Sequence, residues 1–524
     1  MKKKGIVFLF VFLLTGCSSH YLEKSADKEV STILEEKQKK IKNDTLPENA
    51  ITDEISSETV ILDLKTATVL AKNNNRTYKS KQEDVYLNIL DLTYQRYLFK
   101  TRYGFGGGVY MDKGDDESIS GQATFKLLRW LATGAQITFD ITKNFISYLT
   151  GDKKTDFQTI VSLDILQPLL KGAGREIAQE DLIQTEREAV YTIRDFIRYQ
   201  KSFSIETSEK FLNIILLQKR VENFYNNYQS IKATRERIEM LASAGRIPPL
   251  QVDQARQNEY TAYQRWVNAE NSYLSALDNF KIFLGLSTKS SISIKDTFIE
   301  NIMESGIVEP DIDIDGYIGN AIKKRLDLLT SYDRVDDSKR KIKVALNRLK
   351  PEVNLIVRII GSTDTHSYPS IELNQPSYRT GIEFDLPLDK IPNRNYYKKA
   401  LIDLNRKQRD FENKRDTVIL EVYQQYRNLQ EYYQSYLTQQ NSLLLAKRRV
   451  ESTDLLLQAG RTTTRDILEA EEAYLAAKND LATAVVNYLL SYLRFLNSAE
   501  MLELDEKGMW EDLYEKMAKN TVEK

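Results

Sequence analysis

The chain of 524 residues is too long for one ordinary domain unless its shape is extended, and 74 Lys and Arg balance 75 Asp and Glu. This balance gives nucleic-acid binding no electrostatic support. Two histidines, His20 and His366, and one cysteine leave no residues for a metal cluster or for a Ser or Cys nucleophile with a His base. The composition argues against hydrolases and metalloenzymes, although catalysis by carboxylates alone stays open as a remote alternative.

Residues 1–16 have the pattern of an export signal peptide. Three lysines precede the apolar run Ile6–Leu14, which is too short to remain as a membrane span. The run ends in Leu14-Thr15-Gly16-Cys17, which resembles the bacterial lipobox, where the cysteine is diacylglycerated and becomes the first mature residue. We therefore expect an acyl lipid on Cys17 and no other cofactor. A plain signal peptide with an incidental cysteine is the alternative.

Residues 17–58 are charged and weakly periodic, which predicts a solvated tether. Two segments of related pattern follow, a first segment over 59–300 and a second over 301–500. Each is predicted to contain a helix, strands and a helical hairpin, and residues 501–524 are predicted to form a charged tail. No run of about 18 apolar residues follows the signal, so any crossing of a bilayer would use strands.

Strands are predicted at about 103–167 in the first segment and at about 352–386 in the second. Apolar and polar residues alternate there, aromatics such as Tyr103 and Phe384 stand near the ends, and the last strand of each segment breaks into helix at Pro168 or Pro387. This pattern is typical of a transmembrane barrel. A soluble antiparallel sheet with one buried face shows the same alternation. An extra hairpin at about 122–142 either extends the strands outside the membrane or adds to the barrel wall.

Helical hairpins are predicted over 175–284 and 395–497. Apolar residues recur in steps of three and four along Ile467–Phe495 and Val252–Phe280, with a small residue at every seventh place. Each stretch follows an Ala-Gly-Arg turn whose glycine is expected to end the preceding helix in a left-handed conformation. The same seam and turn in two places predict an internal two-fold repeat. The preceding helices, over 175–243 and 395–458, would be about 90–100 Å long if unbroken.

This order of elements resembles the TolC family of outer-membrane efflux and secretion channel proteins, especially its lipid-anchored members. The resemblance covers about residues 60–498, and its motifs are Leu166–Gly172, Asp385–Leu388, the two Ala-Gly-Arg turns and Gly460–Ala470. It implies a mainly α fold with some β structure. It also implies a homotrimer in which each chain gives four strands to a twelve-stranded transmembrane β-barrel. A long periplasmic α-helical coiled-coil barrel continues it.

The resemblance implies a passive export duct and not an enzyme. Such channels belong to tripartite efflux pumps or type I secretion systems, and lie in outer-membrane lipid with their helices in the periplasm. They dock on a periplasmic adaptor protein and an inner-membrane transporter. The alternatives are a non-channel coiled-coil envelope lipoprotein and a periplasmic adaptor, which should show one hairpin flanked by a lipoyl-like and a β-barrel domain. The sequence does not name the exported substrate.

The resemblance also assigns roles to single residues. Asp466 and Glu469 match the acids that line the periplasmic gate of the family, although acids in a first helical turn also simply favour the helix. Gln251 stands where relatives often have an acid and Asp253 lies two residues later, so their part in gating stays open. The tips that dock the adaptor would be Ala244, Gly245 and Arg246, and Ala459, Gly460 and Arg461; the alternative is that they only form turns. The strand acids Asp164, Glu383 and Asp385 are expected to face the barrel lumen.

Overall fold

The computed structural model describes residues 27–35, 60–113, 117–149, 155–294, 306, 307, 309, 312–365, 376–505 and 507–510. Cys17, the signal segment and most of the tether and tail lie outside these residues. The described chain divides into two compact units. The first, the sheet unit, comprises Asp84–Arg194, Thr330–Glu412 and residues 27–35. The second, the hairpin unit, comprises residues 60–83, Asp195–Leu329 and residues 413–510.

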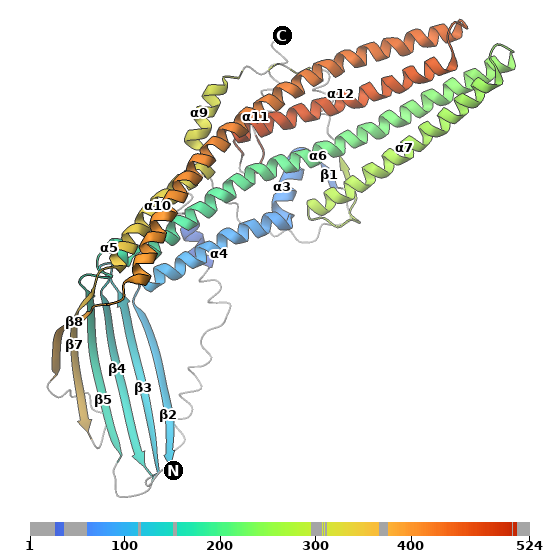
Figure 1. The fold of residues 1–524 in the computed structure, drawn as a ribbon. Coiled ribbons are helices and arrows are strands. Elements are labelled where there is room, and N and C mark those ends of the chain that lie inside the picture. The colour runs from blue at the N-terminus through green and yellow to red at the C-terminus, as the bar shows by residue number, and fades with distance from the viewer. Residues whose placement is uncertain are drawn as a thin grey trace. The chain divides into compact units, whose positions relative to one another are not determined.

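The two sequence segments carry helices in the same order and of closely similar length (Figure 1). The elements of the first segment are β1 (Val60–Leu62), α3 (Leu64–Asn74), α4 (Arg76–Leu98), β2 (Arg102–Lys113), β3 (Glu117–Trp130), β4 (Gln136–Tyr148), β5 (Asp156–Pro168), α5 (Arg175–Ala178), α6 (Glu180–Ser243), α7 (Pro249–Phe283) and β6 (Ile292–Ile294). Those of the second are α9 (Ile314–Lys324), α10 (Leu326–Arg348), β7 (Glu352–Thr365), β8 (Ser377–Asp385), α11 (Ile391–Gln458) and α12 (Thr464–Ser498). Helices α3 and α9 have 11 residues each, α4 and α10 have 23, and α7 and α12 have 35. The predicted helix over 175–243 is interrupted at Gln179, whose φ of −104° and ψ of 8° depart from helical values.

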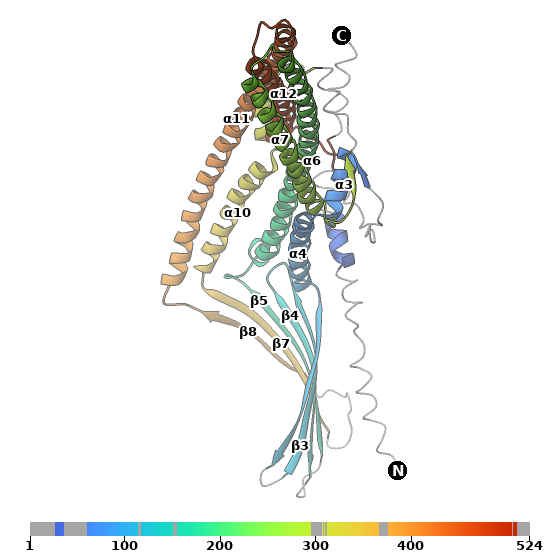
Figure 2. The same ribbon diagram turned by 90° about the vertical axis from the view of Figure 1, so that its right-hand side faces the viewer.

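The sheet unit contains one antiparallel sheet in the order β2-β3-β4-β5-β7-β8. Its strands lie side by side in one curved layer (Figures 1 and 2). The prediction of four strands per chain is therefore wrong. The extra hairpin forms two full strands, β3 and β4, because the alternation of side chains continues through them and their backbone pairs with β2 and β5 over the whole length.

Each face of this sheet has its own character, because directly paired residues of neighbouring strands share a face. One face is apolar over all six strands: Tyr103, Phe105, Phe125, Leu127, Phe139, Ile141, Val161, Leu163, Ile359 and Phe384. The other face is mainly polar: Gln122, Lys126, Asp140, Asn144, Gln158, Ser162, Asp164, Arg358, Arg379 and Glu383. Exceptions on the apolar face are Lys113, Glu117, Arg129 and Lys143, and those on the polar face include Leu128, Trp130, Ile146, Ile160, Leu166, Ile356 and Ile360.

The described part of the chain does not cover the apolar face. Among the described residues of these six strands, no Val, Ile, Leu, Phe, Tyr, Met or Trp side chain is buried. On the edge strands, Phe105 in β2 is 71% exposed and Phe384 in β8 is 70% exposed. A soluble sheet with one buried face would place these side chains against a core. The described part of the chain supplies no such core.

The core of the hairpin unit lies among α6, α7, α11 and α12. Ile231, Ala262, Leu457, Ile467 and Leu468 form a buried cluster to which each of the four helices contributes. The predicted seam of small residues is buried along α12, at Ala470, Ala477, Ala484 and Ser491. Close helix packing explains these small side chains without a further role. No helix within the described residues combines the length and apolar character of a membrane span.

Two breaks between helices in this unit have the same backbone geometry. Helix α3 ends at Asn75 (φ −62°, ψ 124°) before α4, and α9 ends at Arg325 (φ −66°, ψ 117°) before α10. We call these the first and the second elbow. At each, the N–H of the elbow residue donates to an alanine carbonyl four residues earlier, Ala71 or Ala321. Beside the first elbow, β1 and β6 form a short parallel sheet.

Candidate functional site

The two hairpin tips end their first helices with identical backbone bonds. Gly245 (φ 70°) and Gly460 (φ 68°) adopt the left-handed conformation that the sequence predicted. The N–H of Arg246 donates to the Leu241 carbonyl and that of Arg461 to the Leu456 carbonyl, both at 2.9 Å. This is the Schellman pattern, which satisfies carbonyls at the helix end. Glycine is needed for its φ, since an added Cβ would meet no atom within 4 Å at either position.

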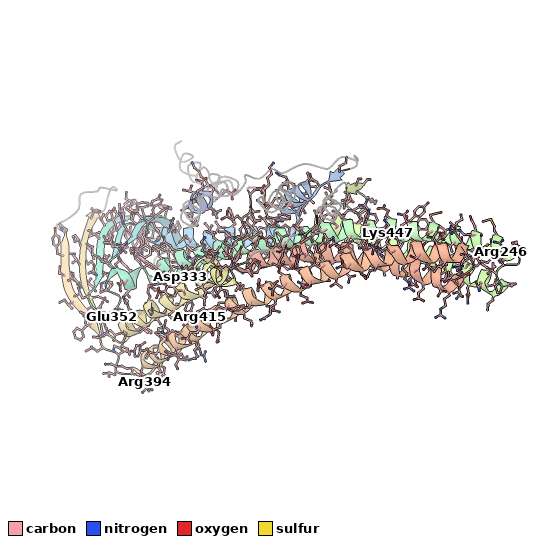
Figure 3. The ribbon with its side chains drawn as sticks, turned by 90° about the horizontal axis from the view of Figure 1, so that it is seen from above. Arg246, Asp333, Glu352, Arg394, Arg415 and Lys447 are labelled. Atoms are coloured by element: carbon pink, nitrogen blue, oxygen red, sulfur yellow. The ribbon has the colours of Figure 1, made fainter. Side chains whose placement is uncertain are left out.

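The side chains of these tips are exposed. Ala244 and Ala459 are exposed, and the guanidinium groups of Arg246 and Arg461 make no hydrogen bond or ion pair to any described residue. Figure 3 shows Arg246 at the turn of the α6–α7 hairpin. Each tip therefore presents a guanidinium with free N–H donors beside a glycine backbone that another chain can approach closely.

Beyond the tips, the second helices of the hairpins start differently. Helix α12 begins with a capping box, in which the Thr463 hydroxyl accepts from the Asp466 N–H and the Asp466 carboxylate accepts from the Thr463 N–H at 2.9 Å. Helix α7 begins at Pro249 after Pro248, without a side-chain cap. The Thr463 and Thr462 hydroxyls also donate to Asp466, and these bonds lower the pKa of its carboxyl to about 2. Asp466 is therefore ionised at neutral pH.

The two predicted gate acids have different partners. Asp466 is half-buried and fixed by the cap, whereas Glu469 is exposed and pairs with Arg449 of α11 at 2.9 Å. Both lie within the first two turns of α12. Gln251, whose role the sequence left open, accepts a hydrogen bond at 2.8 Å from the buried Thr464 hydroxyl, while Asp253 is exposed. Gln251 thereby joins α7 to the start of α12.

Further polar contacts join the two hairpins near their tips. Arg265 of α7 pairs with Glu472 of α12 at 2.7 Å, and Arg237 of α6 pairs with Asp454 of α11. Ser230 of α6 donates at 2.7 Å to Glu471, a buried α12 residue whose pKa is raised by burial. These contacts were not predicted. The sequence places their partners more than 200 residues apart, which periodicity within one helix does not connect.

One missed contact had a visible signal. Arg235 interrupts the apolar seam of α6 and Glu259 interrupts that of α7, and their side chains meet at 2.7 Å. Arg235 also pairs with Glu239 at 2.8 Å, and Arg256 of α7 pairs with the same Glu239 at 2.9 Å. Hydrogen bonds from Arg256 and Arg235 lower the pKa of the Glu239 carboxyl. Two opposite charges in facing seams should have been predicted as a pair.

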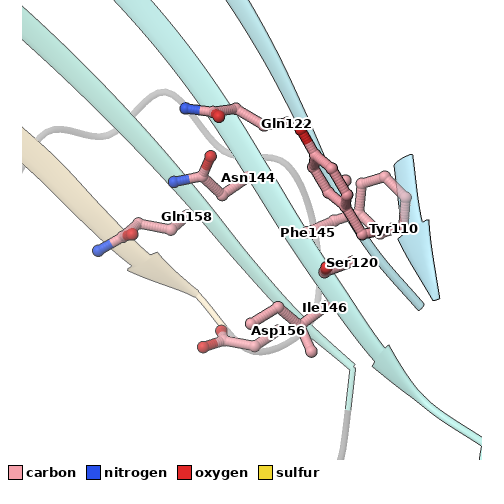
Figure 4. A pocket seen from close by; sticks show the side chains of 9 residues that line it. Tyr110, Ser120, Gln122, Asn144, Phe145, Ile146, Asp156 and Gln158 are labelled. Carbon is pink, nitrogen blue, oxygen red and sulfur yellow. The ribbon is translucent and has the colours of Figure 1, made fainter. Parts of the chain in front are cut away.

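The polar face of the sheet carries the strand acids. Asp164 pairs with Arg358 of β7, and Arg358 lies opposite Arg379 of β8. Glu383 and Asp385 share this face. A shallow pocket at one end of the face is lined by side chains of β2–β5, among them Gln122, Asn144 and Gln158, which project from it together (Figure 4). Pro168 is the last residue of β5, and Pro387 follows β8 by two residues, as the predicted breaks require.

Comparison with known proteins matches a family model to part of the second segment. Residues 317–497 match the family model described as outer membrane efflux protein. Comparison with curated proteins gives no match. This match lies within the second segment and agrees with the resemblance that the motifs predicted.

Solved structures share the fold. CusC, described in terms of transmembrane channel formation, is 12% identical with a TM-score of 0.62 and covers 87% of this chain and 96% of its own. The outer membrane protein VceC of Vibrio cholerae is 12% identical with a TM-score of 0.61, covering 83% and 95%. The CmeC outer membrane channel of Campylobacter jejuni is 14% identical with a TM-score of 0.61, covering 91% and 97%. At such identities the likeness concerns the fold.

Proposed function

Because its residues 317–497 carry the outer membrane efflux protein domain on the fold of the TolC-type channels, we propose that this protein is an outer-membrane export duct. It is the passive component of a tripartite efflux pump or a type I secretion system. Three copies form the duct, with the sheet crossing the outer membrane and the helical hairpins in the periplasm. An acyl lipid on Cys17, a residue outside the described part of the chain, anchors it.

One observation supports this proposal above the others: a six-stranded sheet with an uncovered apolar face and a polar opposite face. Lipid would cover the first and water the second, as in a membrane barrel. A periplasmic adaptor would show a single hairpin, whereas this chain has two with equal tips. The matching helix lengths of the two segments support the internal two-fold repeat.

We place the gate at the start of α12. Three copies would bring three Asp466 and three Glu469 carboxylates into two rings, which favour cations and repel one another. In the proposed closed state, the cross-hairpin contacts of Thr464 with Gln251 and of Arg265 with Glu472 would hold α12 against α7. Opening requires α12 to leave α7, which breaks both contacts.

The gate is tested by the conductance of the purified trimer in planar lipid bilayers. We expect a low resting conductance that rises when Asp466 and Glu469 are both changed to Ala. Loss of the capping box alone could loosen the tip, so the matched variant Asp466→Asn with Glu469→Gln removes charge and keeps side-chain size. Raised conductance in both variants supports carboxylate rings. Unchanged conductance in both contradicts the gate, and absence of any conductance in all variants contradicts the duct.

The exposed tips are proposed to dock the periplasmic adaptor. Arg246 and Arg461 are free to hydrogen-bond carbonyls at a partner's helix ends. Changing both to Glu should weaken adaptor crosslinking in the native cell without loss of the trimer. The matched control reverses Lys447 and Arg448, two exposed cations on the shaft of α11. Equal crosslinking in both double variants would show that the tips only form turns.

A further inference from the structure

The sheet of this chain has two more strands than the family pattern supplies, and their place decides the width of the duct. We infer that the transmembrane wall of the assembled trimer has eighteen strands, and that its outer lumen admits solutes of larger cross-section than a twelve-stranded duct does. This inference rests on the proposed trimeric duct and deepens it. Its basis is the position of the hairpin β3–β4 within the sheet.

The strands of the hairpin are long enough to cross a membrane. Strands β3 and β4 have 14 and 13 residues, and β5 and β7, the next two strands of the sheet, have 13 and 14. At about 3.3 Å per residue and a tilt of roughly 45°, 13 residues span about 30 Å. This exceeds the apolar band of about 25 Å that such barrels present to lipid. Length therefore does not separate the hairpin from the other strands.

The hairpin continues the apolar face without a gap. Leu127 of β3 lies opposite Phe139 of β4 in register, and Phe125 lies opposite Ile141. The same rows extend to β2 on one side and to β5 on the other. A hairpin that projected beyond the membrane into water would have no use for these rows. Lys143 is the one cation of β4 on this face, and its long side chain can reach toward the interface.

The hairpin also continues the polar face. Gln122 of β3, Asn144 of β4 and Gln158 of β5 are paired in register and form a row of amides across three strands (Figure 4). Next to them, the hydroxyls of Thr124 and Thr142 are hydrogen-bonded at 3.2 Å. A water-filled lumen hydrates such a row, whereas lipid would leave its amide groups without partners.

The two edge strands of the sheet can pair with further copies of the same chain. Strands β2 and β8 form the two edges and, with six antiparallel strands, they run in opposite directions. The β8 strand of one copy can therefore pair antiparallel with the β2 strand of the next. Both edges carry exposed aromatics, at 74% for Tyr103 and 71% for Tyr378. Unpaired backbone groups at an open edge are not tolerated in hydrocarbon, so pairing with further copies satisfies the backbone groups of both edge strands.

The number of strands fixes the width. Barrel diameter grows roughly linearly with strand number, so three copies of six strands give a lumen about 1.5 times as wide as three copies of four. The cross-sectional area rises about twofold. Barrels of 16 to 18 strands leave an open aqueous channel, which suits bulky solutes.

Fluorescent labels on single cysteines test where the hairpin lies in the trimer. Phe125→Cys on the apolar face and Gln122→Cys on the polar face are labelled in vesicles that contain brominated phosphatidylcholine. We expect the lipid to quench the label at 125 and aqueous iodide to quench the label at 122. The matched controls on β5, Val161→Cys and Ser162→Cys, should behave in the same way.

The controls separate the two proposals. If β5 shows the lipid and water pattern but both hairpin labels are quenched by iodide alone, the eighteen-stranded wall is wrong and the duct stands. If Val161→Cys is not quenched by the lipid either, the proposed duct itself fails.

Excision of the hairpin tests the width. The Leu149 N–H donates to the Glu117 carbonyl at 2.7 Å, so the ends of Glu117–Leu149 are adjacent and their removal leaves a short connection. Removing two strands keeps the remaining neighbours antiparallel. Polyethylene glycols of graded size, added from the extracellular side, should enter the intact trimer at radii about 1.5 times larger than the excised one. Equal size cut-offs for the polyethylene glycols would overturn the inference, provided that native mass spectrometry counts three subunits in both the intact and the excised assembly. If the excised chain does not assemble, the fluorescent labels at positions 122 and 125 provide the test.

Discussion

At the first elbow, the Asn75 side chain donates to the Phe283 carbonyl at 2.8 Å, and at the second, the Arg325 guanidinium donates to the Ser498 carbonyl at 3.3 Å. These carbonyls end α7 and α12, so each elbow is tied to the end of its own segment's last helix. The backbone is nearly the same in both. The side-chain chemistry is not, since a neutral amide fills one elbow and a cation fills the other.

The residues packed around the two elbows also differ in polarity. Around the first, aromatic rings pack together: Tyr78, Phe196, Phe203 and Phe283. Around the second, the buried Arg325 pairs with Asp327 at 3.0 Å and with Glu421, and Asp327 also pairs with Arg198 and Lys414. The same backbone join therefore accepts either an apolar or an ionic filling, provided that its polar groups are satisfied.

The helix ends beside the elbows extend this comparison. After α7, the left-handed residue is Gly285 (φ 72°), and after α12 it is Glu500 (φ 58°), the one non-glycine residue with positive φ in the described chain. The Glu500 carboxylate pairs with Lys201 at 2.7 Å and with Arg198 at 3.1 Å. Left-handed backbone costs a side-chain-bearing residue about 1–2 kcal/mol. The ionic cluster holds Glu500 in a conformation that glycine adopts freely in the first segment.

The largest expected effect comes from breaking the ionic elbow at its centre. Arg325→Met leaves Asp327 and Glu421 without their main partner and should destabilise the hairpin unit by about 3–5 kcal/mol. Its counterpart Asn75→Leu leaves the Phe283 carbonyl and the Tyr78 N–H without their side-chain partner and should cost about 1–3 kcal/mol. Thermal unfolding of the trimer, followed by circular dichroism, compares the two. The double variant Arg325→Met with Asp327→Leu should recover part of the loss; no recovery would mean that the cluster is not a coupled unit.

The next largest effect is expected in the stability of the two elbows at acid pH. Burial alone would raise the pKa of the Asp327 carboxyl, but the hydrogen bond from Arg325, with Arg198 and Lys414, holds it well below its ordinary value near 4. The unfolded chain therefore binds this proton more readily, and stability from the cluster is present above about pH 4 and is lost as the pH falls below it. Burial raises the pKa of Tyr78 to about 12, so the aromatic elbow does not titrate in this range.

Hydrogen exchange between pH 6 and pH 3 measures this contrast, with rates corrected for their intrinsic pH dependence. Protection should fall in the amides of α10 next to Arg325 and persist in those of α4 next to Asn75. The control Asp327→Asn should remove most of the difference between pH 6 and pH 3. Equal loss at both elbows would contradict the assignment to Asp327.

A smaller effect is expected at the left-handed residues. Gly285→Ala should cost more than the roughly 1–2 kcal/mol of backbone strain, since its Cβ would lie 2.6 Å from the Asn74 carbonyl oxygen. Glu500→Gly relieves that strain and loses two ion pairs, so the two terms oppose each other and its net cost should be below that of Gly285→Ala. The urea unfolding midpoints of the two variants measure these costs. A greater loss of stability from Glu500→Gly than from Gly285→Ala would mean that the ion pairs of Glu500 outweigh its backbone strain.

The local features of this fold were predictable where short spacing specifies them. The Ala-Gly-Arg tips, the buried small seam of α12 and the two proline breaks follow from turn chemistry and periodicity. The four-strand pattern of the family does not hold here, because residues 117–148 alternate and pair as two further strands. The ionic elbow was not predictable in this way. Arg198, Arg325, Lys414 and Glu500 are far apart in sequence, and only the packing of α6 and α11 against the ends of α9 and α12 brings them together.

The tips, unlike the elbows, should respond alike. Gly245→Ala and Gly460→Ala each place a Cβ where no atom lies within 4 Å, so the cost is the left-handed backbone alone, about 1–2 kcal/mol at both. Asn tolerates this conformation, and Gly245→Asn and Gly460→Asn should cost less than the alanine variants. Hydrogen exchange of the Arg246 and Arg461 amides reports each tip separately, since these donate the closing bonds. A clear difference between the two tips would mean that a contact beyond the single chain acts on one of them, as docking of a partner at one tip would do.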